Sequence, residues 1–172
     1  FVEQLNESGQ VRGYSTRYHG GASQLGRTAW IYDAAAGDTF ALVLSTRSDG
    51  YAFSSAVYLG DDGLTLGYYH LIDEADNNLG NRAFYFTIDE GLFDLGLLVD
   101  DGLDANGWQL LAQSIRANGL GQILGHGLLN SQTGGSFAYL LTPITTPVPE
   151  PSSLALVVLG LLGFWGWRRI FP

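Results

Sequence analysis

Apolar residues in the first 142 positions form short clusters of aromatic and β-branched side chains, separated by turns rich in Gly, Asp and Asn. The clusters Trp30-Ile31-Tyr32 and Phe84-Tyr85-Phe86 show this pattern most clearly. Such clusters favour pleated, half-buried strands, and the Gly-containing segments after them, 33–38 and 87–91, predict hairpin turns. Return strands and further strands are then expected at 39–44, 92–97, 51–59 and 108–115.

The alternative to strand is helix at two places. Segment 110–116 contains good helix formers, and the three Ala residues at 34–36 could make one helical turn. Neither segment carries a long stripe of apolar residues with the 3.6-residue period of a helix. We therefore predict strand and turn there, and a mainly β fold for this part of the chain.

One motif recurs along the chain. Residues 6–13 and 118–125 share N-x-x-G-Q-[VI]-x-G, and residues 60–67 keep its two glycines. The motif recurs after 54 and 58 residues, and a second element, in which an aromatic residue follows Ala, recurs after 54 and 55. The second element lies at 29–33, 83–87 and 138–142. Repetition at this period predicts about four short strands per unit, in a β-repeat region 1–142 with units near 5–58, 59–114 and 115–142.

The motif followed by an aromatic strand resembles the HAF-repeat family of bacterial extracellular proteins. The resemblance covers most of residues 5–142, but Thr28, Arg82 and Phe137 stand where that family has the His of its name. It implies propeller-like, four-stranded β units. Three units do not close a propeller ring, so we expect either an incomplete propeller or an open stack of β units.

The pattern changes at Pro143. Segment 143–153 contains four of the five Pro residues and predicts an extended, semi-rigid spacer. Segment 154–167 is uncharged and overwhelmingly apolar, which predicts a transmembrane helix that is short against the ~20 residues of a full span; a buried core helix is the alternative. Arg168 and Arg169 close the run, which predicts that the basic end, 168–172, stays cytoplasmic and the rest lies outside.

The order of Pro149-Glu150-Pro151, apolar helix and Arg-Arg resembles the PEP-CTERM sorting signal of Gram-negative bacteria. The resemblance implies that an exosortase recognises Pro149, Glu150 and Pro151 at the inner membrane and removes the tail. It also implies a mature protein at the cell surface or outside the cell. Export on this route needs an N-terminal signal, so we expect that Phe1 is not the natural start of the chain.

The charge of the chain narrows the choice of partners. The net charge is −9, and all seventeen acidic residues precede position 154, whereas two of the eight basic residues follow it. A body this acidic repels phosphate backbones, so we expect no nucleic-acid partner. The chain has no Cys, which excludes disulfides, thiolate metal sites and a Cys nucleophile.

No motif in the chain predicts catalysis. His19, His70 and His126 lack the spacing of metal ligands; we expect them at strand ends or on the surface, and a zinc triad across the repeats is the alternative. No G-x-S-x-G elbow occurs, so a hydrolase triad is not supported. We predict no catalytic residue, no metal and no cofactor.

The weak exception is a loop rich in oxygen ligands. Such loops suit calcium, but this one lacks the Glu that ends an EF-hand loop, and acidic turns are commonly just solvated. Segment 73–78 is a similar but weaker case. The candidate calcium ligands are Asp100, Asp101, Asp104 and Asn106.

Together these features predict an exported cell-surface or extracellular-matrix protein without catalytic activity of its own. The alternative is a module that binds carbohydrate or another surface polymer, with Trp30, Trp108 and Tyr residues as stacking platforms, although both Trp are better explained as core residues. An exopolysaccharide-acting enzyme is a further alternative, since paired carboxylates arise easily among seventeen acidic residues.

Overall fold

The computed structural model describes residues 1–19, 23–100, 102–103, 107–129 and 135–144. The chain divides into two compact units, which we call the body, Phe1–Thr142, and the tail, Pro143–Pro172. The predicted helix at 154–167 lies outside the described residues. Among the residues that are described, no helix is long and apolar enough to cross a membrane.

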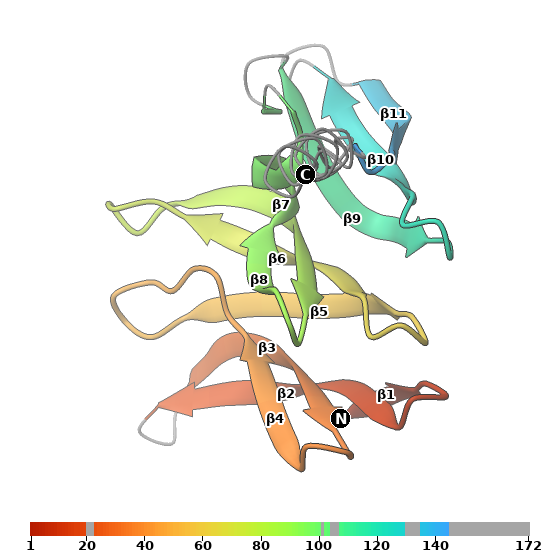
Figure 1. Ribbon diagram of the computed structural model, residues 1–172. Helices are drawn as coiled ribbons and strands as arrows, with labels where there is room; N and C mark the ends of the chain where they lie inside the picture. The colour runs from red at the N-terminus through yellow and green to blue at the C-terminus, as the bar shows by residue number, and fades with distance from the viewer. Residues whose placement is uncertain (20–22, 101, 104–106, 130–134, 145–172) are drawn as a thin grey trace, which may run out of the picture. The chain divides into compact units, whose positions relative to one another are not determined.

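The body consists almost entirely of antiparallel hairpins, which confirms the prediction of a mainly β fold (Figure 1). Its described strands group into three consecutive repeats. The first repeat contains β1 (Val2–Leu5), β2 (Gln10–His19), β3 (Ser23–Asp33) and β4 (Asp38–Leu42). The second contains β5 (Ala52–Leu59), β6 (Thr65–Ile72), β7 (Asn78–Thr87), β8 (Gly91–Asp94) and the short 3-10 helix η1 (Leu95–Leu98). The third contains β9 (Trp108–Ala117), β10 (Ile123–Leu129) and β11 (Gly135–Leu141).

The same five-residue turn recurs in the body, at hairpins in all three repeats and between β4 and β5, which do not pair with each other. The first residue donates its N–H to the carbonyl of the fifth, and the fourth donates to the carbonyl of the first. The fourth residue has positive φ, as in a type I turn that ends in a β-bulge. Within the described ranges these turns are 6–10, 47–51, 60–64, 73–77 and 118–122.

The recurring N-x-x-G-Q motif holds this turn with two side chains. Asn6 Oδ1 accepts from the Gln10 N–H at 2.7 Å, and Asn6 Nδ2 donates to Gln10 Oε1 at 3.0 Å. Asn118 and Gln122 make the same two bonds at 3.1 and 2.9 Å. Turn 60–64 keeps only the backbone pattern, because Gly60 has no side chain. The repeated motif therefore specifies a hairpin turn and its clamp.

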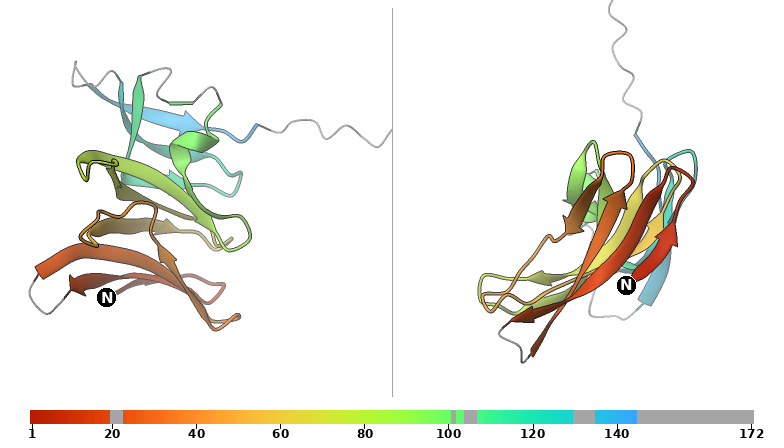
Figure 2. Two further views of the ribbon diagram at one scale, coloured as in Figure 1. Left: turned by 90° about the vertical axis from the view of Figure 1, so that its left-hand side faces the viewer. Right: turned by 90° about the horizontal axis from the view of Figure 1, so that it is seen from below.

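The three repeats pack face on face. One apolar core lies between the first and second repeats and includes Ile31, Leu42, Phe84 and Phe86. A second core lies between the second and third repeats and includes Leu66, Ile115, Ile123 and Tyr139. Figures 1 and 2 show the same order of repeats from two directions, with the second repeat between the other two.

This packing corrects the propeller-like expectation. Propeller blades surround a common axis, whereas here both faces of the second repeat are buried against its neighbours. Among the described residues no sheet closes on itself: β1 and β8 end one sheet, and β9 and β11 end the other. A two-residue parallel contact between β3 and β5 joins the first two repeats into one continuous sheet.

The predicted strand at 92–97 is wrong in its second half. Strand β8 ends at Asp94, and η1 follows. The Asp94 carboxylate accepts from the Gly96 N–H at 2.7 Å and from the Tyr69 hydroxyl at 2.6 Å. This cap turns the chain into a short helix. In contrast, β9 runs through 110–116, as predicted.

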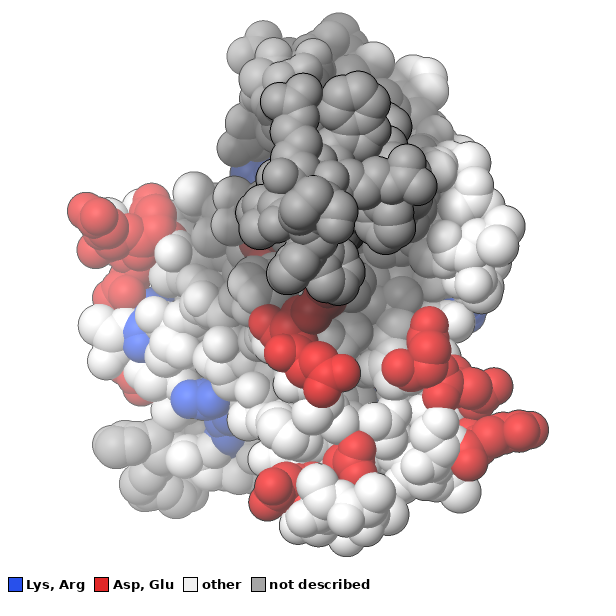
Figure 3. Space-filling model, in the orientation of Figure 1, with Lys and Arg blue, Asp and Glu red and all other residues white. Residues whose placement is uncertain are grey.

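Acidic side chains prevail over the face of the body shown in Figure 3. Arg side chains are few there, as the net charge of −9 requires. The face of the body drawn in Figure 3 is therefore acidic, in keeping with the composition of the chain.

Candidate functional site

A row of stacked side chains crosses the first two repeats, and we call it the aromatic ladder. The Arg27 guanidinium lies between two rings, 4.8 Å from the centre of Tyr14 and 4.6 Å from the centre of Phe53. Phe53 in turn stacks on His70, with ring centres 4.3 Å apart and planes 13° from parallel. Cation–π contacts of this kind contribute about 0.5–2 kcal/mol each.

His70 is the polar end of the ladder. Its Nδ1 lies 2.8 Å from the Tyr51 hydroxyl and 3.1 Å from Asn78 Nδ2. An amide nitrogen can only donate, so Nδ1 accepts and the ring proton sits on Nε2. Burial, helped by the nearby positive charge of Arg27, lowers the pKa of His70. The imidazole is therefore neutral at pH 7.

The ladder is assembled by strand pairing. Thr16 pairs with Arg27, so the side chain of Arg27 lies diagonally across from Tyr14 on the same face. The contact between β3 and β5 pairs Arg27 with Phe53. All of these residues are half-buried, and Arg27 Nε is buried without a hydrogen-bond partner among the described residues. Aromatic faces, a guanidinium and a hydroxyl are groups that bind sugars and acidic polymers.

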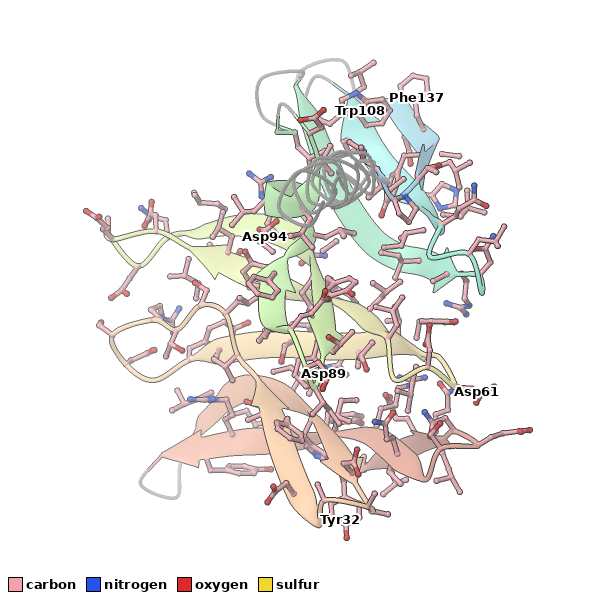
Figure 4. All side chains as sticks on the ribbon, viewed as in Figure 1. Tyr32, Asp61, Asp89, Asp94, Trp108 and Phe137 are labelled. Atoms are coloured by element: carbon pink, nitrogen blue, oxygen red, sulfur yellow. The ribbon has the colours of Figure 1, made fainter. Side chains whose placement is uncertain are left out.

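The two Trp residues proposed as stacking platforms have different settings. The Trp30 ring lies over Gly13, and its Nε1–H donates to Ser15 Oγ at 3.1 Å. Trp108 packs against the core between the second and third repeats. Its ring meets Phe137 edge-on, with centres 6.4 Å apart, as Figure 4 shows. Trp108 thus combines a core contact with partial exposure.

The predicted ligands do not form a metal site in the described part of the chain. Asp101, Asp104 and Asn106 lie outside it, and Asp100 is exposed after η1, so the weak calcium alternative at this loop stays untested. The carboxylate of Asp73 instead accepts hydrogen bonds from Ala75 and Asn77 within turn 73–77. Within the described ranges no three His, Asp or Glu residues lie close enough together to hold a metal.

Comparison with known families identifies the tail. A family model described as the PEP-CTERM protein-sorting motif matches residues 147–170. The match includes Pro149, Glu150, Pro151, Arg168 and Arg169, all of which lie outside the described residues. It supports export and sorting by an exosortase and implies a C-terminal signal anchored in the membrane. No curated protein and no solved structure matches the chain, and the resemblance to HAF repeats stays a prediction.

Sequence reasoning missed the ladder. Tyr14, Arg27, Phe53 and His70 come from four different strands, and no short motif links them. The one signal in the sequence is that Arg residues fall within aromatic-rich strands. That signal becomes a site only when the register between β3 and β5 is known.

Proposed function

We propose that this chain is an exported cell-surface or extracellular-matrix protein whose body acts without catalysis and without a cofactor. The observation that carries the proposal is the PEP-CTERM match at residues 147–170. In this proposal an exosortase recognises Pro149, Glu150 and Pro151 and removes the tail. A repeat body with a long buried interface on both sides of its middle repeat suits a structural role.

Before processing, the apolar segment 154–167 holds the precursor in the inner membrane. Arg168 and Arg169 keep the short end in the cytoplasm, because translocating paired Arg is costly. The body then lies outside the cytoplasm. Protease added to spheroplasts should degrade the body and spare a C-terminal epitope tag; degradation of the tag would contradict this orientation.

The sorting motif is tested by replacing Pro149, Glu150 and Pro151 with Ala in the natural precursor. We expect uncleaved precursor to accumulate in the inner-membrane fraction, because the recognition residues are gone. Pro143→Ala lies outside the matched segment and serves as the control that changes another spacer Pro. Normal processing of the triple variant would contradict the proposal.

The second candidate is binding of a surface polysaccharide, and the aromatic ladder favours it. Arg27 supplies a positive charge held between two rings, and Tyr51 and Asn78 present polar groups beside His70. Affinity electrophoresis in a gel that contains a neutral glucan tests this role, because the net charge of −9 opposes binding to an acidic polymer. The polysaccharide in the gel should slow the migration of the body less when Tyr51 is replaced by Ala. Tyr18 is exposed and lies outside the ladder, so Tyr18→Ala should leave the migration unchanged. Equal mobility of both variants and the parent chain would contradict it.

A further inference from the structure

Each repeat has one face that is marked by a Gly paired with an aromatic residue on the next strand. A Cβ on any of these glycines would clash with the paired ring, so the ring lies directly over the Gly. We call this the trailing face. The three pairs are Gly13–Trp30, Gly67–Phe84 and Gly125–Tyr139.

The trailing face is the one that packs on the preceding repeat. Phe84 is fully buried in the core shared with the first repeat. Tyr139 is buried in the core shared with the second repeat. The same Gly–aromatic pair is thus used twice for the same purpose.

The opposite face of each repeat is marked by the neighbouring cross-strand pair, since successive strand residues point to opposite sides. We call it the leading face, and its pairs are Arg12–Ile31, Leu66–Tyr85 and Leu124–Leu140. Ile31 is buried toward the second repeat, and Leu66 is buried toward the third. The leading face of one repeat therefore packs on the trailing face of the next.

The leading face of the third repeat carries the same kind of side chains but is uncovered in the described structure. Leu124 is 52% exposed and Leu140 is 59% exposed, while the equivalent Leu66 is 0% exposed. At the other end, the trailing face of the first repeat presents Trp30, which is half-buried, and Tyr32, which is 37% exposed. Figure 4 shows Tyr32 at the side of the first repeat that faces away from the second.

A polar contact sets how one repeat sits on the next. Asn6 Nδ2 donates to the Gly60 carbonyl at 2.8 Å, and Gln4 Nε2 donates to the Leu59 carbonyl at 2.9 Å. Turn 6–10 of the first repeat is thereby locked to turn 60–64 of the second. Asn118 has the same clamp with Gln122 and lies at the surface. The third repeat thus presents the same donor at its own uncovered face.

We propose that the leading face of the third repeat docks on the trailing face of the first repeat of a second copy of this chain. Leu124 and Leu140 would cover Trp30 and Tyr32, and Asn118 would meet the turn of the second copy at 6–10. Two different faces meet, so the contact is head-to-tail and leaves both ends free to add further copies. The product is a filament, in which each junction repeats the apolar face-on-face packing already made twice within the chain. This assembly does not depend on how the chain is sorted.

Cross-linking tests the contact directly, because the chain has no Cys. Leu140→Cys and Tyr32→Cys are made in the full chain, kept in mild detergent and treated with a short bis-maleimide. Mixing the two single variants should give a cross-linked dimer. The double variant should give a series of longer cross-linked oligomers. In the control mixture Ser48→Cys replaces Leu140→Cys. Ser48 is exposed but belongs to neither the leading nor the trailing face, so it should give no dimer with Tyr32→Cys.

Two results would overturn the proposal. The first is a dimer from Leu140→Cys alone that is as abundant as in the mixture, because it would mean that like faces meet. The second is the absence of any product between chains, as expected if another segment of the same chain covers the leading face.

A charge on the leading face gives an independent test by sedimentation. Leu124→Glu should abolish species larger than one copy, since it places a carboxylate in an apolar contact. Leu97→Glu changes an 81% exposed Leu on η1, which belongs to neither face, and should leave the size distribution unchanged. Persistence of the larger species in Leu124→Glu would contradict the contact.

Discussion

The sharpest stability prediction compares Asn6→Ala with Asn118→Ala. The two residues occupy the same position of the same motif and clamp their turns with the same hydrogen bonds. Their surroundings differ, because Asn6 is 7% exposed and reaches the next repeat through the Gly60 carbonyl. Asn118 lies at the surface, where water can replace its bonds.

The expected magnitudes follow from these contacts. Asn6→Ala removes three hydrogen bonds and leaves buried groups of Gln10 and Gly60 without partners. At about 1 kcal/mol per bond, with a further penalty for unpaired buried groups, the loss in free energy of unfolding is about 2–4 kcal/mol. Asn118→Ala should cost only about 0.5–1 kcal/mol, since its groups are solvated after the change.

Urea unfolding of the full chain in mild detergent, followed by Trp fluorescence, measures both losses. The difference between the variants is the informative quantity, because any effect of the detergent or the tail is common to both. Equal losses for the two variants would refute the reasoning, since they would show that docking of turn 6–10 on turn 60–64 contributes nothing.

Three further predictions concern single side chains. Gly67→Ala should lower the free energy of unfolding by about 1–3 kcal/mol, because the added Cβ would clash with the Ser55 carbonyl and the Phe84 ring; Gly119→Ala, which meets open space, should change a thermal melt hardly at all. Burial raises the pKa of Tyr139 to about 12, and its hydroxyl has no hydrogen-bond partner among the described residues. Tyr139→Phe should therefore leave urea stability unchanged or raise it, and a clear loss would contradict the assignment. The side-chain hydrogen bond from Arg47, with the Tyr51 N–H, lowers the pKa of Asp49 from 3.8 to about 2. The ionised Asp49 carboxylate therefore stabilises the fold above pH 3.8, and this stabilisation is lost as the pH falls toward 2. Asp49→Asn should therefore make the free energy of unfolding depend less on pH in this acidic range.

Local features of the fold could be predicted from the sequence because they depend on neighbouring residues. The N-x-x-G-Q motif specifies a turn through bonds between residues four apart, such as Asn6 and Gln10. The two elements that recur at nearly one period mark the strands that carry the Gly–aromatic pairs, but the pairing itself is known only from the structure. Aromatic clusters predicted strands that the structure contains, as in β3 and β7.

Contacts between repeats could not be predicted from the sequence. The pattern of apolar residues within one repeat shows that its faces are apolar but does not say which other repeat covers them. Four-stranded units suit a ring or a stack equally well, and the choice depends on two apolar faces being buried at once in the second repeat. The sequence of β8 continued the apolar pattern through Leu97, but the Asp94 cap ended the strand. The aromatic ladder likewise depends on the β3–β5 register, which has no local signal.

Intact-mass measurement of the natural protein, recovered from the cell surface or the medium, would show whether the tail is a sorting signal that is removed. We expect a mature chain that lacks the apolar segment 154–167 and ends near the Pro149–Pro151 motif. A recovered protein that still carries Trp165, Trp167 and Arg168 would contradict it.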